Sequence, residues 1–256
     1  MSAVFTPAST SRARTDERYE PAADDAADIA DICVKRCGEP TTWITATELR
    51  ESLALCLLEV IQATCSDYRA VVDLLDRYRN YRYARTRDFS SSNSTPDGLQ
   101  ELLNTFDEVG GPTIWVGKVA NFRRRYSGDG VPVRAASILH IAHILHQLKV
   151  NTVTDLRTAE NSEGKMGEIE HAWFTELGEL TSHAWPHLRV LVDLDEVDSS
   201  AAVNAFREQC TPNMDSHTFR GGMPRAAGRL GVSTSELEFT ISRWYLSRLN
   251  RSIVDA

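Results

Sequence analysis

The sequence predicts an all-α fold, and two kinds of observation lead to this. Apolar residues recur at helical spacing over most of the chain, and we find no alternating run long enough to require a sheet. Two Ser/Thr-x-x-Glu segments, Thr45 to Glu48 and Ser233 to Glu236, have the form of capping boxes that begin helices. No segment repeats at a fixed period, which excludes a solenoid.

The N-terminal part lacks this helical spacing. Residues 1–40 mix Ser, Thr, Ala, Asp and Glu, so we expect a largely disordered tail, in which a short helix over residues 25–37 is an open alternative. The helical domain is expected to cover residues 41–256.

The helices expected after residue 41 follow from apolar spacing and from Gly and Pro at their ends. One helix begins at Thr45 and runs to residue 64, and a second follows it. A composition-defined loop covers residues 89–98, and residues 134–148, apolar on more than one face, predict a central buried helix. A polar loop is expected from residue 156 to about 167. The other expected helices lie at residues 99–106, 113–122, 169–180, near 188–192, at 199–209 and 216–230, with a last one from Ser233.

Composition excludes several classes of protein. The formal net charge of −8 and the pI near 5.4 argue against a general nucleic-acid coat protein, which would be basic. No apolar run is long enough to span a membrane, and the first residues do not resemble a secretory signal. Five cysteines without framework spacing favour a reduced, cytoplasmic setting.

Three segments, in order, resemble the helix-hairpin-helix DNA-glycosylase superfamily, typified by endonuclease III. Residues 57–75 resemble its early helix with a Gln-containing turn. Residues 109–139 are similar to the stretch that ends in a basic residue and an apolar helix, with Arg134 in the basic position. Residues 173–184 and 197–201 fall where the family has its hairpin and its Val-Asp segment. The resemblance runs from about residue 45 to 250, is closest to a poorly characterised bacterial branch, and implies a two-lobed helical fold.

The resemblance implies roles for individual residues. Asp198 falls on the family's catalytic Asp, which stabilises the charge that develops on the sugar as the flipped base leaves. Gln62 falls on a pocket residue. The hairpin glycines are replaced by Glu179 and Thr181, and His183 holds the lysine position, so a Schiff-base lyase is not expected. Without catalysis, Asp198 would simply complement the dipole of the helix at 199–209.

Two basic-aromatic stretches are candidates for nucleic-acid contacts. Residues 77–87 carry five arginines and three tyrosines, and residues 121–126 include Arg123, Arg124 and Arg125. Arginine pairs with phosphate, and tyrosine stacks on bases. The open alternative is that these arginines pair with the eleven acidic residues between positions 155 and 200, inside the molecule or across a homodimer.

Other sites are not expected. His140, His143 and His146 drift around their helix and predict no metal site, and no cofactor motif is present. We therefore expect a divergent, non-catalytic glycosylase-like protein that binds a partner. This partner is either double-stranded DNA, contacted through Gln62, Arg123, Arg124, Arg125, Arg134 and His183, or another protein. Two alternatives stay open: an active base-excision glycosylase, and a helix-turn-helix regulator, because residues 225–243 resemble that motif.

Overall fold

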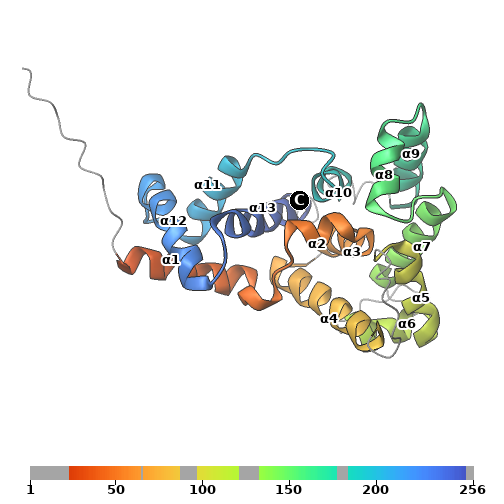
Figure 1. The fold of residues 1–256 in the computed structure, drawn as a ribbon, viewed down its shortest axis with the longest axis horizontal. Coiled ribbons are helices and arrows are strands. Elements are labelled where there is room, and N and C mark those ends of the chain that lie inside the picture. Colours follow the sequence, from red (N-terminus) through yellow and green to blue (C-terminus); the bar gives the residue numbers. More distant parts are fainter. Residues whose placement is uncertain (1–22, 65, 87–96, 121–132, 178–183, 252–256) are drawn as a thin grey trace, which may run out of the picture.

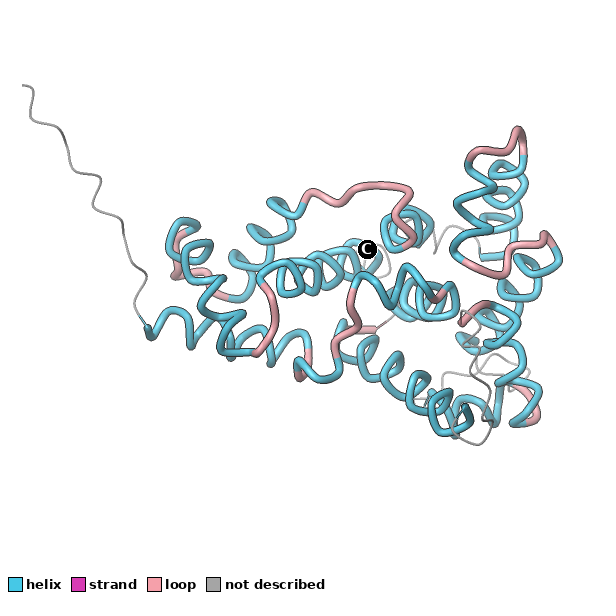
Figure 2. Tube along the Cα trace, in the orientation of Figure 1, coloured by secondary structure: helices cyan, strands magenta, loops and turns pink. Residues whose placement is uncertain are grey.

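The structure, a computed structural model, describes residues 23–64, 66–86, 97–120, 133–177 and 184–251. Within these ranges every regular element is helical and no strand is present, as Figure 2 shows. The all-α prediction is therefore confirmed. The finer assignment to the glycosylase type stays a prediction.

The helices follow one another with short connections. In chain order they are α1 (Ala23–Cys37), η1 (Pro40–Thr42), α2 (Ala46–Glu51), α3 (Leu53–Ala63), α4 (Tyr68–Thr86), α5 (Leu99–Val109), α6 (Pro112–Trp115), the π-helical η2 (Val116–Ala120), α7 (Val133–Gln147), α8 (Val153–Glu160), α9 (Lys165–Leu177), α10 (Ala184–Leu191), α11 (Ser199–Cys210), α12 (Ser216–Leu230) and α13 (Thr234–Arg251).

Two groups of helices lie at opposite ends of the molecule (Figure 1). One end contains the first described helix and the last three. There α1 packs on α12 and α13, and α11 packs on α13. The other end holds α5 to α9. Between them α3 contacts α4, α7, α10 and α13. Every residue of α3 is buried, which makes this helix the centre of the core.

The short helix left open at residues 25–37 is present as α1, so the boundary expected at residue 40 is wrong. This helix buries Ile29, Cys33 and Cys37 completely, and Gly222 lets α12 approach it so closely that a Cβ there would lie 2.6 Å from the Ile29 side chain. The Trp43 indole donates to the carbonyls of Cys37 and Gly38, which holds the end of α1 against η1. Residues 23–40 therefore belong to the helical body; residues 1–22 lie outside the described residues.

The single helix expected from Thr45 to residue 64 is two helices. The capping box of Thr45 and Glu48 is present and begins α2. The break falls at Ser52, whose hydroxyl accepts from the Leu55 amide and donates to Asp97. A serine side chain that accepts from an amide in the first turn of a helix favours a helix start at that position. It does so here although the apolar spacing continues through Ser52.

The polar loop expected from residue 156 to about 167 is shorter: residues 161–164 connect α8 to α9. Residues 153–160 form α8, which begins with a capping box of Thr152 and Asp155. The expected helices at 199–209 and 216–230 agree with α11 and α12, and the Ser233 hydroxyl accepts from the Glu236 amide at the start of α13.

Candidate nucleic-acid interface

Two of the residues expected to bind DNA meet at one hydroxyl. Gln62 Nε2 donates to Ser66 Oγ at 2.8 Å, and Arg134 Nη1 donates to the same oxygen at 2.9 Å. The three residues come from the last turn of α3, the α3–α4 turn and the start of α7. The fold therefore brings Arg134 to Gln62 across about seventy positions of sequence.

Local sequence explains how this cluster is held. The α3 helix is strongly apolar and is buried along its whole length. Gln62 near its end is therefore only 1% exposed, and its buried side-chain amide needs hydrogen-bond partners. Asp67 then begins α4 by accepting from the Ala70 amide. Ser66 lies between these two features, half-buried, with its hydroxyl directed at both donors. We call Gln62, Ser66 and Arg134 the Ser66 cluster.

Asp198 lies exposed at the start of α11. It is the N-cap of this helix, and its carboxylate accepts from the Ala201 amide at 3.0 Å. This contact is the dipole-complementing role that the sequence left open as the alternative to catalysis. Asp198 therefore contacts the backbone of its own helix. Within the described residues it shares no hydrogen bond or ion pair with Gln62 or Arg134, which meet at Ser66.

The remaining expected DNA contacts cannot be placed. Arg123, Arg124, Arg125 and His183 lie outside the described residues, as do the hairpin positions 179 and 181. The flanking residues show that the hairpin segment starts as the end of α9 and continues as α10 from Ala184.

The arginine-rich stretch in α4 pairs within the molecule. Arg79 binds Glu48 and Asp76, and Arg82 binds Asp97. Arg77 donates to the Ala120 carbonyl in η2. These three arginines therefore pair inside the molecule, which was the alternative to nucleic-acid binding. Their partners, however, lie outside the acidic region 155–200 that the sequence suggested.

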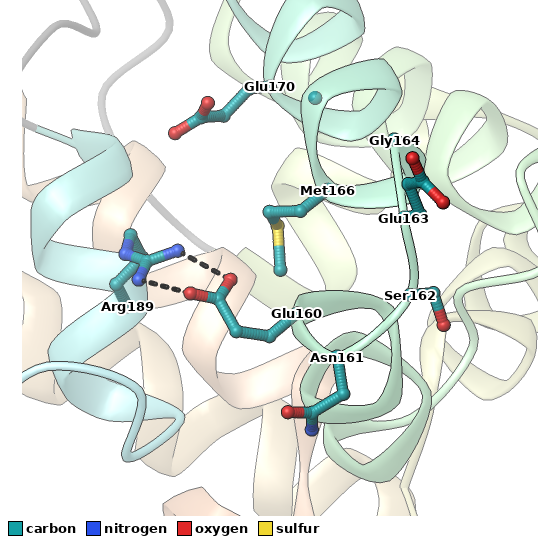
Figure 3. A pocket seen from close by; sticks show the side chains of 9 residues that line it. Glu160, Asn161, Ser162, Glu163, Gly164, Met166, Glu170 and Arg189 are labelled. Carbon is teal, nitrogen blue, oxygen red and sulfur yellow. Dashed lines mark hydrogen bonds and ion pairs between the residues drawn. The ribbon is translucent and has the colours of Figure 1, made fainter.

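That acidic region supplies its own counter-charges. Arg189 of α10 forms a two-pronged contact with Glu160 at 3.0 Å and another with Asp195 at 2.8 and 3.0 Å. The hydrogen bonds from Arg189 hold the pKa of Glu160 below its usual range. Figure 3 shows the Arg189–Glu160 contact at the edge of a cavity of about 600 Å³, with Met166 and Glu170 facing it from α9.

A fully buried ion pair, which sequence reasoning missed, joins α3 to α13. Arg243 contacts both carboxylate oxygens of Glu59, with Nη2 at 2.6 Å and Nε at 3.0 and 3.1 Å, and donates to the Ile44 carbonyl. His187 of α10 lies 3.5 Å from the same carboxylate. Burial alone would raise the pKa of Glu59, but Arg243 and then His187 outweigh it and hold the pKa at about 2.

The comparisons with known proteins identify a family. A family model described as "Domain of unknown function (DUF8548)" matches residues 27–247, most of the chain. The chain belongs to the DUF8548 family. None of the curated proteins or solved structures shows a significant match. The DUF8548 match begins inside α1, in agreement with the packing of that helix, and it includes the Ser66 cluster, Glu59, Asp198 and Arg243.

The helix-turn-helix alternative is not supported by this DUF8548 structure. A recognition helix needs a free face to enter a DNA groove. The second helix of the proposed motif is α13, which contacts α1, α3, α4, α10, α11 and α12. Between Ser235 and Leu249, the side chains it exposes are those of Ser235, Arg248 and Leu249.

The described residues contain no group of His, Cys, Asp or Glu that could hold a metal ion. His140 instead pairs with Glu176 of α9 at 2.6 Å. No described helix has the length and apolarity needed to cross a bilayer.

Proposed function

We propose that this chain is a non-catalytic nucleic-acid-binding protein built on a helix-hairpin-helix glycosylase-like scaffold. The observation that carries the proposal is the Ser66 cluster. Gln62 and Arg134 were each suggested as DNA contacts by the resemblance alone, and they meet at one hydroxyl. Gln62 is 1% exposed, so the prediction that it contacts DNA itself is wrong; it holds Ser66 from inside the fold, and Arg134 is the member of the cluster that we expect at a phosphate.

The chemistry of the cluster suits a phosphate. Arg134 is half-buried at the start of α7, and one of its nitrogens is fixed by Ser66. A guanidinium offers five donors in a planar fork, and the hydrogen bond to Ser66 Oγ fixes the orientation of this fork at the start of α7. Contacts of this kind position a duplex without reading its sequence.

Two features favour binding over base excision. Asp198 is accounted for as the cap of α11, and the hairpin has Glu179 and Thr181 where the resembled superfamily has two glycines. The arrangement of α1 beside α12 and α13, with α5 to α9 at the other end, supports the two-lobed scaffold that the resemblance implies.

The test compares two duplexes, one carrying a charged abasic-site mimic and one undamaged, at low and moderate salt. The wild-type protein and Asp198→Asn are measured side by side, because Asn is an equally good N-cap and leaves α11 intact. We expect salt-sensitive binding that is equal in both proteins and that shows no preference for the mimic.

Other outcomes would redirect the account. Preference for the mimic that is lost in Asp198→Asn would favour the active glycosylase and contradict the non-catalytic proposal. Absence of binding to either duplex would overturn the nucleic-acid function and direct the search to a protein partner.

A further inference from the structure

The Ser66 hydroxyl accepts two hydrogen bonds. Gln62 Nε2 donates to Ser66 Oγ at 2.8 Å, and Arg134 Nη1 donates to the same oxygen at 2.9 Å. A serine hydroxyl has two lone pairs and one hydrogen, so these two donors occupy both of its acceptor positions. The hydroxyl hydrogen of Ser66 is therefore left to donate to a further group.

This hydrogen has no acceptor within the described ranges. Both contacts of the Ser66 side chain there are with donors, and the side chain is half-buried. Gln62, which is 1% exposed, approaches the oxygen from the interior of the fold. Because the bonds of a hydroxyl oxygen point in different directions, the hydrogen lies away from Gln62 and toward the surface. Ser66 therefore presents a donor to whatever lies outside the fold.

Ser52 provides a contrast at the other end of α3. Its hydroxyl accepts from the Leu55 amide at 3.1 Å and donates to the Asp97 carboxylate at 2.9 Å. The donor and acceptor capacities of Ser52 are thus both used by the chain itself, as in most hydroxyls at helix ends. Ser66 differs because both of its neighbours are donors, so its acceptor must come from outside the chain.

The charges around Ser66 suit an anion with one negative charge. Arg134 is positive, Arg69 is exposed in the first turn of α4, and the exposed Asp67 places a carboxylate beside Ser66. These three side chains leave one net positive charge, and the N-terminal end of α4, a helix of 19 residues, adds positive potential. A phosphodiester carries one negative charge, whereas a terminal phosphate carries about 1.5 to 2 at pH 7 and would meet Asp67 at a greater cost.

We propose that Ser66 itself binds a phosphodiester of the nucleic-acid backbone, beside Arg134; this inference rests on the nucleic-acid function proposed above. Arg134 supplies the positive charge, and the Ser66 hydroxyl donates a neutral hydrogen bond to an oxygen of the same phosphate. Gln62 is a positioning residue, because its hydrogen bond from the interior keeps the hydroxyl hydrogen directed outward. A contact of this kind holds the backbone and reads no base.

The test is a double-mutant cycle in the binding of an undamaged duplex over a range of salt concentrations, with urea unfolding as the check that each variant is folded. Ser66→Ala removes a neutral donor, so binding should weaken about two- to tenfold while the slope of log K against log salt stays that of wild type. Ser66→Thr keeps the hydroxyl and should bind as wild type does. Ser66→Ala/Arg134→Gln should bind more weakly than Arg134→Gln by a similar factor, because each side chain contacts the phosphate directly.

The outcomes separate this inference from the function on which it rests. If the double variant binds as tightly as Arg134→Gln, Ser66 acts only by orienting Arg134, and the inference is overturned while the nucleic-acid function stands. Absence of binding by wild type overturns both. A duplex with phosphorylated ends should bind as its unphosphorylated form does, and a requirement for the terminal phosphate would contradict a phosphodiester site.

Discussion

Arg243 and Glu59 face each other across 184 positions of sequence, and neither side chain exposes more than 1% of its surface. The guanidinium contacts both carboxylate oxygens, and the Ile44 carbonyl accepts a further hydrogen bond. This pair connects the central helix α3 to α13 of the end that also contains α1. It is a buried polar contact between two helices that also pack in the hydrophobic core.

Removal of one partner should be costly. Arg243→Met leaves the Glu59 carboxylate buried without its main counter-charge, and we expect a loss of about 3–5 kcal/mol in the free energy of unfolding. The double variant Glu59→Leu/Arg243→Met removes both charges and should regain most of this loss. Urea unfolding followed by circular dichroism measures both. A double variant as unstable as Arg243→Met would contradict this view of the pair.

Acid should weaken the fold through Glu59. The pKa of Glu59 is lowered from 4.5 to about 2 in the folded state, so its contribution to stability is complete above about pH 4.5 and is lost as the pH falls toward 2. Wild type should lose more stability over this window than Glu59→Leu/Arg243→Met, in which the group is absent. Parallel pH dependences in the two proteins would count against the lowered pKa.

Gly98 is required by close packing. A Cβ at this position, just before α5, would lie 2.5 Å from the Asn151 carbonyl oxygen, which is backbone and cannot move aside. Gly98→Ala should destabilise the protein by about 1–3 kcal/mol. The matched control is Gly228→Ala in α12, where a Cβ meets nothing within 4 Å; it should stabilise by about 0.4–1 kcal/mol. Thermal unfolding of the two variants should therefore move in opposite directions.

Asp198 should behave as a helix cap. Asp198→Ala loses the acceptor for the Ala201 amide, and we expect its free energy of unfolding to fall by about 0.5–2 kcal/mol. Asp198→Asn should unfold at the same denaturant concentration as wild type. The denaturant midpoint of each variant checks this. If Asp198→Ala proves as stable as wild type, the cap contact contributes nothing, and the exposed carboxylate needs another explanation.

Local signals explain which parts of the fold could be predicted. The capping boxes at Thr45 and Ser233 are read from neighbouring residues and were both correct. The start of α8 was missed because Asp155, rather than Glu or Gln, completes its box with Thr152. The α2–α3 break was missed because apolar spacing continues through Ser52, although this serine caps α3 by accepting from the Leu55 amide.

The candidate site shows the same limit. Gln62 and Arg134 were found by resemblance, but their shared partner Ser66 is a small polar residue with no signal of its own. Glu59 and Arg243 lie 184 positions apart and share no motif, so the sequence gives no sign that they pair. Only the crossing of α3, α10 and α13 places them together with His187.

The most direct test of the nucleic-acid proposal is the salt dependence of duplex binding by Arg134→Gln and by Arg220→Gln. Both variants remove one positive charge, but Arg220 lies exposed on α12, away from the Ser66 cluster. If Arg134 contacts a phosphate, its variant should bind more weakly and the slope of log K against log salt should fall by about one, while Arg220→Gln binds as wild type does. Equal behaviour of the two variants, or no binding by wild type, would contradict the account.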